Sequence, residues 1–208
     1  MKHAKPFVLS MVVALGLAAL LAAPATAKDA KLELSPKVKV QGTKLPTSDK
    51  VGSSSDPAIG MTAPTLVGKG FDAKLVTIGG PGTPRIVVFL SHSCPHCQAE
   101  VPVIVKLAAK GVFDGVDVET VTTNTSKRLP NYPPSKWLKR EKWPFKTVLA
   151  DDARLRAFFG YGGQAFPYFV LLDAEGVVVA RAEGELSEAL IKDAAARLAA
   201  GEPIFATS

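Results

Sequence analysis

The two cysteines of this chain lie two residues apart in a CPHC sequence at residues 94–97, and the chain has no others. A buried-strand pattern at residues 85–91 precedes them, and residues 98–110 have the pattern of a helix. This order places Cys94 at a helix N-terminus, where free backbone N–H groups and the helix dipole stabilise a thiolate. The thiolate is the attacking species in thiol–disulfide exchange. We therefore predict reversible redox chemistry, with Cys94 as nucleophile and Cys97 as resolving thiol.

The same cysteines allow two other interpretations. A structural zinc site usually has four Cys or His ligands, and the nearby histidines, His92 and His96, crowd all four candidates into a few residues. So tight a cluster would hardly surround a tetrahedral ion, and no metal site is predicted. A module that holds copper through the two thiols and a nearby histidine stays open as the alternative function. An inert disulfide is a third interpretation, weakened because so short a loop constrains the unfolded chain little.

The first 27 residues have the pattern of a secretory signal peptide. Lys2 and Lys5 precede an apolar run at residues 7–23, and Ala25-Thr26-Ala27 supplies a small-x-small cleavage sequence. We expect cleavage after Ala27, and the alternative is an uncleaved membrane anchor. Either way the protein is expected to be secreted or otherwise extracytoplasmic, in the cell envelope, where disulfides persist.

The formal net charge of +6 is modest and spread along the chain. The densest basic stretch comprises Lys136, Lys139, Arg140, Lys142 and Lys146. Nucleic-acid binding would need stronger clustering, so we interpret this stretch as a solvated helix face; attraction to an acidic partner or membrane surface is the alternative. The expected partners are proteins that carry thiols or disulfides, and no cofactor is predicted.

One domain is expected after the signal peptide. Residues 28–56 are predicted to be a flexible linker, with a short edge strand as an option near residues 31–40 and a Ser- and Gly-rich stretch from residue 48. The domain itself is assigned to residues 57–202, and residues 203–208 to a C-terminal tail.

The pattern within the domain predicts an α/β fold, a central mixed β-sheet flanked by helices. Strands are expected at residues 74–78, 85–91, 116–123, 147–149, 168–172 and 177–182, and helices at residues 98–110, 135–141, 153–159 and 187–200. Trp137 and Trp143 are expected to be core or cover residues rather than a substrate platform, and His92 to be an ordinary loop residue.

Several motifs together resemble the thioredoxin superfamily, and within it the exported TlpA-like thiol–disulfide oxidoreductases, also called redoxins. The resemblance covers about residues 57–200. Its motifs are Gly60-Met61-Thr62-Ala63-Pro64, Phe71-Asp72-Ala73-Lys74 with Val76, the CPHC sequence, Glu100 with Pro102, Tyr161-Gly162 through Phe166-Pro167, and Asp173-Ala174-Glu175-Gly176. It implies a thioredoxin-like fold with an N-terminal β-hairpin and a helical insertion.

The resemblance also implies roles for residues outside the cysteine pair. It makes Pro167 a cis-proline packed against the CxxC, although an ordinary trans-proline stays the alternative. Backbone groups of Phe166 would then bind an extended substrate, with Pro95 and His96 at the same surface. Glu100, one helical turn beyond Cys97, is the candidate proton acceptor.

Two departures from the family concern partner choice and proton transfer. Ser93 stands where the family usually has Trp, and Val88 stands where thioredoxin has a buried Asp. The CPHC sequence favours a disulfide oxidase, whereas the TlpA-like pattern favours a reductase supplied by a membrane redox partner. The sequence leaves this direction open, together with the oligomeric state.

Overall fold

The structure is a computed structural model that describes Met1 and residues 32–205. The predicted signal peptide and the first residues of the predicted linker lie outside the described residues. Among the described residues, no helix is long and apolar enough to cross a membrane.

A single mixed sheet forms the centre of the domain. The strands are β1 (Lys39–Gln41), β2 (Thr65–Lys69), β3 (Leu75–Ile78), β4 (Arg85–Leu90), β5 (Asp117–Thr122), β6 (Val148–Ala150), β7 (Tyr168–Leu172) and β8 (Val178–Glu183). Their order is β1-β2-β6-β5-β4-β7-β8, and β3 pairs with β2. β4 pairs parallel with β5 and antiparallel with β7, so the mixed sheet of the predicted thioredoxin-like fold is confirmed.

Strand β4 is buried along its whole length, because helices and loops cover both faces of the sheet. Its side chains alternate between two apolar clusters: Ile86, Val88 and Leu90 join one, and Val87 and Phe89 join the other. The strand that precedes the cysteines is therefore held from both sides.

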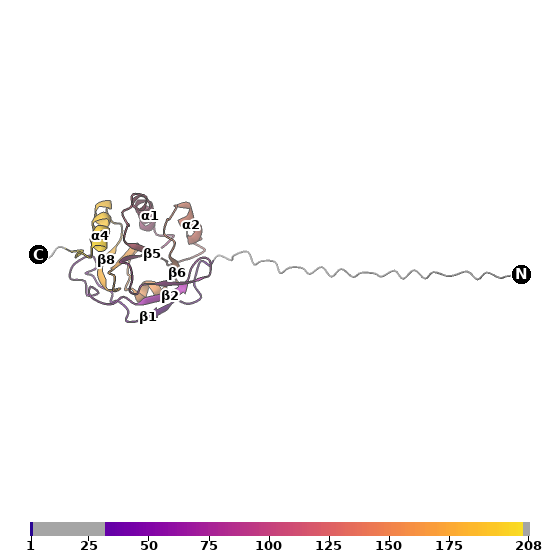
Figure 1. Ribbon diagram of the computed structural model, residues 1–208, viewed down its shortest axis with the longest axis horizontal. Coiled ribbons are helices and arrows are strands. Elements are labelled where there is room, and N and C mark those ends of the chain that lie inside the picture. Colours follow the sequence, from indigo (N-terminus) through magenta and orange to yellow (C-terminus); the bar gives the residue numbers. More distant parts are fainter. Residues whose placement is uncertain (2–31, 206–208) are drawn as a thin grey trace.

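Three helices cover the first of these faces. They are α1 (Pro95–Ala108), α2 (Pro134–Arg140) and α4 (Glu188–Ala200), which Figure 1 shows side by side above the sheet. Helix α3 (Arg156–Gly160) packs on the opposite face, where Phe158 contacts Phe89 with ring centroids 5.9 Å apart. The helix predicted at residues 153–159 thus begins three residues later than expected.

The N-terminal segment covers the rest of this opposite face, and the predicted flexible linker is wrong for its described part. Residues 32–56 run against the domain, with β1 paired to β2 and with Val38 and Leu45 buried. The Leu45 N–H donates to the Gly160 carbonyl at 3.0 Å. These residues belong to the folded domain because their apolar side chains complete its second core.

An ion pair between Asp56 and Arg181 fastens this segment to β8. Both side chains are fully buried, and the Arg181 Nε–H donates to Asp56 Oδ2 at 2.8 Å. Arg181 Nη1 also donates to the Pro46 carbonyl at 2.8 Å and to the Tyr168 hydroxyl at 3.0 Å. The Ser- and Gly-rich stretch that begins at residue 48 thus ends at Asp56, whose charge can be buried because Arg181 neutralises it.

The predicted N-terminal hairpin is formed by β2 and β3, of which the sequence pattern indicated only the second. Gly68 interrupts the apolar pattern of β2, so the sequence pattern does not predict this strand. In the fold, a Cβ at Gly68 would lie 3.1 Å from a methyl carbon of Leu149, so a side chain there would require Leu149 to shift. Ala73, which occupies the usual glycine position of the hairpin turn, adopts a left-handed φ of 61°.

The segment between β5 and β6 contains the predicted helical insertion, α2. Trp137 lies on α2 and is buried, and the Trp143 indole N–H donates to Thr120 Oγ1 at 3.0 Å, so both tryptophans have the expected core or cover role. At the other end of the chain, Ile204 and Phe205 pack against the core. The described part of the predicted C-terminal tail is therefore attached to the domain.

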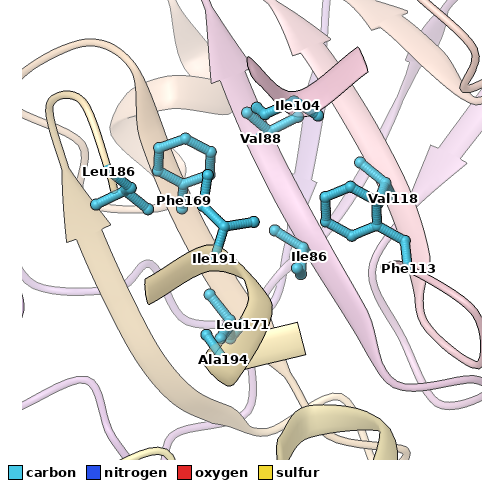
Figure 2. Close-up of a pocket in the computed structure, with 10 residues that line it drawn as sticks. All are labelled: Ile86, Val88, Ile104, Phe113, Val118, Phe169, Leu171, Leu186, Ile191 and Ala194. Atoms are coloured by element: carbon cyan, nitrogen blue, oxygen red, sulfur yellow. The ribbon is translucent and has the colours of Figure 1, made fainter. Parts of the chain in front are cut away.

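A small cavity of about 30 Å³ lies between the sheet and helices α1 and α4. Figure 2 shows its lining, with Ile191 of α4 and Phe169 of β7 near its centre. All ten lining residues are apolar. The cavity lies within the core beneath the helix that carries the cysteines.

Candidate active site

The end of β4 places the first cysteine at the start of α1. After Leu90 the chain turns, and the Cys94 N–H donates to the Ser91 carbonyl at 3.1 Å. Cys94 is the N-cap residue of α1 in extended conformation, and Pro95 occupies the first turn, where a missing N–H costs no hydrogen bond. The predicted helix therefore begins just after Cys94, as the CPHC sequence required.

The Cys94 thiol is partly exposed and faces the loop that precedes β7. Its Sγ donates to the Phe166 carbonyl at 3.6 Å, which joins segments 72 residues apart. The Phe166–Pro167 peptide bond is cis, as the resemblance implied. Phe166 itself is partly buried, with its ring centroid 4.4 Å from that of Phe158.

Cys97 lies behind this surface and is fully buried. Both cysteines are free thiols in this structure. Burial is the main reason that the pKa of Cys97 is raised well above its usual value; the Ser91 N–H, 3.4 Å from its Sγ, opposes the rise, and Cys94 and Glu100 add to it. The first thiol of the pair is thus partly exposed and the second is buried.

Glu100 is buried rather than surface-exposed, with 2% of its area accessible. Its Oε2 accepts the Leu186 N–H at 3.2 Å, and its Oε1 has no hydrogen-bond partner among the described residues. Burial raises its pKa from 4.5 to about 7; the Leu186 N–H opposes the rise and the Glu185 carboxylate adds to it. A buried carboxyl with a raised pKa therefore lies close enough to the buried thiol to add to the rise in the pKa of Cys97.

His96 does not direct its ring nitrogen at the thiols. Its Nδ1 lies 2.7 Å from Glu185 Oε1, and both side chains are largely exposed. Any positive charge that His96 carries is therefore offset by a neighbouring carboxylate. No feature of the sequence indicated Glu185, because it lies 89 residues away on the connection from β8 to α4.

His92, which we expected to be an ordinary loop residue, is buried and holds the insertion in place. Its Nδ1 lies 2.6 Å from the Pro130 carbonyl, and its Nε2 accepts the Ser126 N–H at 3.1 Å. Since a carbonyl only accepts, the Nδ1 carries the ring proton. The Gln98 side chain of α1 donates to the His92 carbonyl at 3.2 Å, so the insertion, the turn before Cys94 and the first turn of α1 form one bonded unit.

The described residues, Met1 and 32–205, contain no group of three or more His, Cys, Asp or Glu side chains that could hold a metal ion. His92 and His96 were the nitrogen ligands of the copper alternative. Their rings are engaged with Pro130 and Ser126 in one case and with Glu185 in the other.

Known proteins resemble this chain in sequence and in fold. The Redoxin family profile matches residues 58–198. The methylamine utilization protein MauD of Methylobacillus flagellatus is 32% identical over 132 residues, which span 60% of this chain and 57% of that relative. StoA from Bacillus subtilis has a TM-score of 0.52 at 20% identity, covering 66% of this chain and 98% of StoA. An uncharacterized conserved protein from Geobacillus kaustophilus has a TM-score of 0.61 at 19% identity, and the match covers 72% of this chain and 86% of that protein.

Proposed function

The chain belongs to the Redoxin family, and from this membership and its paired thiols we propose that it is a TlpA-like thiol–disulfide oxidoreductase that acts on protein substrates outside the cytoplasm. One observation carries the proposal: the partly exposed Cys94 thiol lies beside the Phe166–Pro167 loop, while Cys97 is buried three residues further along the same helix. An exposed attacking thiol and a sheltered resolving thiol are what two-step disulfide exchange requires.

Reduction of a substrate disulfide proceeds in two steps. The Cys94 thiolate attacks one sulfur of a substrate disulfide, and a new S–S bond joins Cys94 to the substrate while the other substrate sulfur leaves and takes a proton. Cys97 then gives up its proton and attacks Cys94 Sγ, which releases the second substrate thiol. Two electrons pass to the substrate, and a Cys94–Cys97 disulfide remains; oxidation of a substrate is the reverse.

Glu100 is the proposed acceptor of the Cys97 proton. Because burial raises the pKa of Cys97, this thiol needs a base before it can attack. A carboxyl whose pKa is about 7 is divided between acid and base forms at neutral pH, so it can both take and return the proton.

Substrate binding is assigned to the surface around Cys94. An extended substrate segment would lie along the backbone of Phe166 beside cis-Pro167, as an added strand does at a sheet edge. Pro95 and His96, both exposed on the first turn of α1, border the same surface. The electrons reside in the two thiols, so the proposed reaction needs no cofactor, and a membrane redox partner would restore the oxidised or reduced form.

Trapping of reaction intermediates tests this function. Cys97→Ser should accumulate mixed disulfides on Cys94, because the thiol that resolves them is missing, whereas Cys94→Ser should abolish exchange with disulfide substrates. Both products can be identified by mass spectrometry of non-reduced peptides. Recovery of substrates on Cys97 instead would reverse the assignment of the two thiols.

A measurement on the same purified protein distinguishes the copper-binding alternative from the oxidoreductase function. A redox titration with and without added Cu(I) measures whether the metal changes the dithiol equilibrium. Stoichiometric copper binding in a protein that exchanges no disulfides would replace the oxidoreductase function with metal handling.

The direction of electron flow follows from the reduction potential. The CPHC sequence favours the reduced form, so we expect a value between that of thioredoxin, about −270 mV, and that of a strong disulfide oxidase, about −120 mV. The His96–Glu185 pair, which offsets the charge of His96, argues against the upper end of this interval. Equilibration with glutathione buffers gives the number, and a value at or below that of thioredoxin would make the protein a dedicated reductase.

A further inference from the structure

The insertion presents a basic turn beside the CPHC sequence. Ser126 and Leu129 close this turn, with the Leu129 N–H donating to the Ser126 carbonyl at 3.2 Å. Lys127 and Arg128 occupy its exposed centre, and neither forms an ion pair with any residue in the described part of the chain. We call residues 126–129 the basic turn.

The buried ring of His92 fixes this turn from both ends. It accepts a hydrogen bond from the first residue of the turn, Ser126, and donates one to Pro130, which directly follows the turn. Only Ser93 separates His92 from Cys94, so the position of the turn is set by the same loop that positions the thiol. The turn is therefore a fixed part of the surface around Cys94.

The composition of the turn suits contact with another protein. Leu129 is 40% exposed, and it is one of few large hydrophobic side chains that the described residues leave so open. Two unpaired cations beside an exposed aliphatic group form a surface that attracts carboxylates and then buries an apolar side chain.

The opposite side of the thiol carries the opposite charge. The insertion follows β5 on one side of β4, whereas the connection from β8 to α4 lies on the other side, beyond β7. That connection carries Glu185, which contacts His96, whereas the next acidic residue, Glu188, is paired with Lys106 and Lys192. A substrate near Cys94 thus meets unpaired cations on one flank and the Glu185 carboxylate on the other.

We propose that the basic turn is a docking element that selects protein substrates with acidic residues flanking one side of the exchanging cysteine. His92 acts as its positioning residue. This inference rests on the proposed oxidoreductase function and specifies the class of protein on which it acts. Complementary charge raises the rate of encounter, and salt screens it.

Three disulfide-linked peptides test the proposal with the purified, reduced protein. They are identical except that two Asp, two Ser or two Lys flank the cysteine. Stopped-flow kinetics should give an acidic-to-basic rate ratio of about 10 at low salt, and the ratio should approach 1 at about 0.5 M salt. Removing the two charges, by Lys127→Gln with Arg128→Gln, should bring the low-salt ratio to about 2.

A matched control removes the same charge elsewhere. Lys110→Gln with Lys146→Gln neutralises two exposed lysines at the far end of α1 and before β6, at the opposite end of the sheet from Cys94. This variant should keep the wild-type ratio. His92→Phe, which removes both hydrogen bonds to the insertion, should lower the ratio although both cations remain; thermal unfolding of each variant verifies that it is folded.

The outcomes separate this inference from the function on which it rests. Equal rates for the acidic and basic peptides in wild type, or equal losses in the test and control variants, would overturn docking at the basic turn. So would binding to anionic phospholipid vesicles through the same two residues without any peptide preference. A wild-type protein that reacts with none of the three peptides would instead refute the oxidoreductase function itself.

Discussion

Among the regions of this domain that bury charged side chains, two differ most clearly in whether the buried charge has a partner. Under the N-terminal segment, Asp56 and Arg181 are both inaccessible and neutralise each other. Behind the CPHC sequence, Glu100 is also buried, but it receives one backbone N–H and forms no ion pair with any described residue. The first arrangement holds two parts of the chain together, and the second leaves a group ready to exchange a proton.

The pKa directions express the same contrast. Burial alone would raise the pKa of Asp56, but hydrogen bonds from Arg181 and from the Ala58 N–H outweigh it, so the pKa lies below its usual value. For Glu100 burial prevails, and the pKa rises to about 7. Buried carboxyls with shifted pKa values concentrate at functional sites when a neutral form is useful there.

Breaking the paired region should have the largest effect on stability. Asp56→Ala leaves the Arg181 guanidinium buried without its anion, so we expect a loss of about 3–5 kcal/mol in the free energy of unfolding, measured by urea denaturation. Exchange activity per folded molecule should stay at the wild-type value, because Asp56 belongs to the N-terminal cover and not to the surface around Cys94.

An exposed ion pair provides the control for this variant. Asp193 and Arg197 lie 2.9 Å apart on α4 and are largely exposed. Asp193→Ala should cost less than about 1 kcal/mol, since water screens such pairs. If Asp56→Ala proves too unstable to purify, Asp56→Asn measures the same pair with one hydrogen-bonding oxygen retained; similar costs for Asp56 and Asp193 variants would contradict the comparison.

The substitution Glu100→Gln removes the buried carboxyl that lacks a cationic partner, and it should stabilise the domain in a defined pH range. Below pH 4.5 Glu100 is protonated in both the folded and the unfolded chain, so Glu100→Gln changes little. Between pH 4.5 and about 7 the unfolded chain loses the proton while the folded one keeps it, so wild-type stability falls as pH rises. At pH 8 the Gln variant should therefore be the more stable protein by roughly 3 kcal/mol.

The same substitution should slow the resolving step of exchange and flatten its pH profile near pH 7, because the amide cannot accept the Cys97 proton. Glu175→Gln, in the exposed turn between β7 and β8, is the matched control and should alter neither quantity. A Gln variant with wild-type pH profiles for both stability and exchange would make Glu100 a merely structural residue.

Local patterns predicted the parts of the fold that local chemistry determines. The apolar run that became β4, the helix start after Cys94 and the C-terminal helix with its Ser187 cap all follow from neighbouring residues. The cis bond before Pro167 was implied by the resemblance, and the Phe166 carbonyl accepts from the Cys94 thiol; substrate binding by Phe166 stays a prediction.

Long-range contacts account for what the sequence pattern missed. The sequence pattern predicts a linker that includes residues 32–56, because nothing near Asp56 in the chain indicates a partner for its charge. That partner, Arg181, lies 125 positions later. The sequence does not predict that His92 holds the insertion in place, since its partners Ser126 and Pro130 lie in a polar segment without periodicity. Such contacts depend on the finished sheet order, which no short window of the chain contains.

The cavity between α1, α4 and the sheet makes hydrostatic pressure a specific perturbation of this domain. Its lining offers no polar atom to hold water in its volume of about 30 Å³. Unfolding eliminates this void and lowers the volume of protein and solvent together, which compression favours. Compression therefore acts where α1, the helix that begins at the cysteine pair, packs on the sheet; Figure 2 shows the side chains that line this cavity.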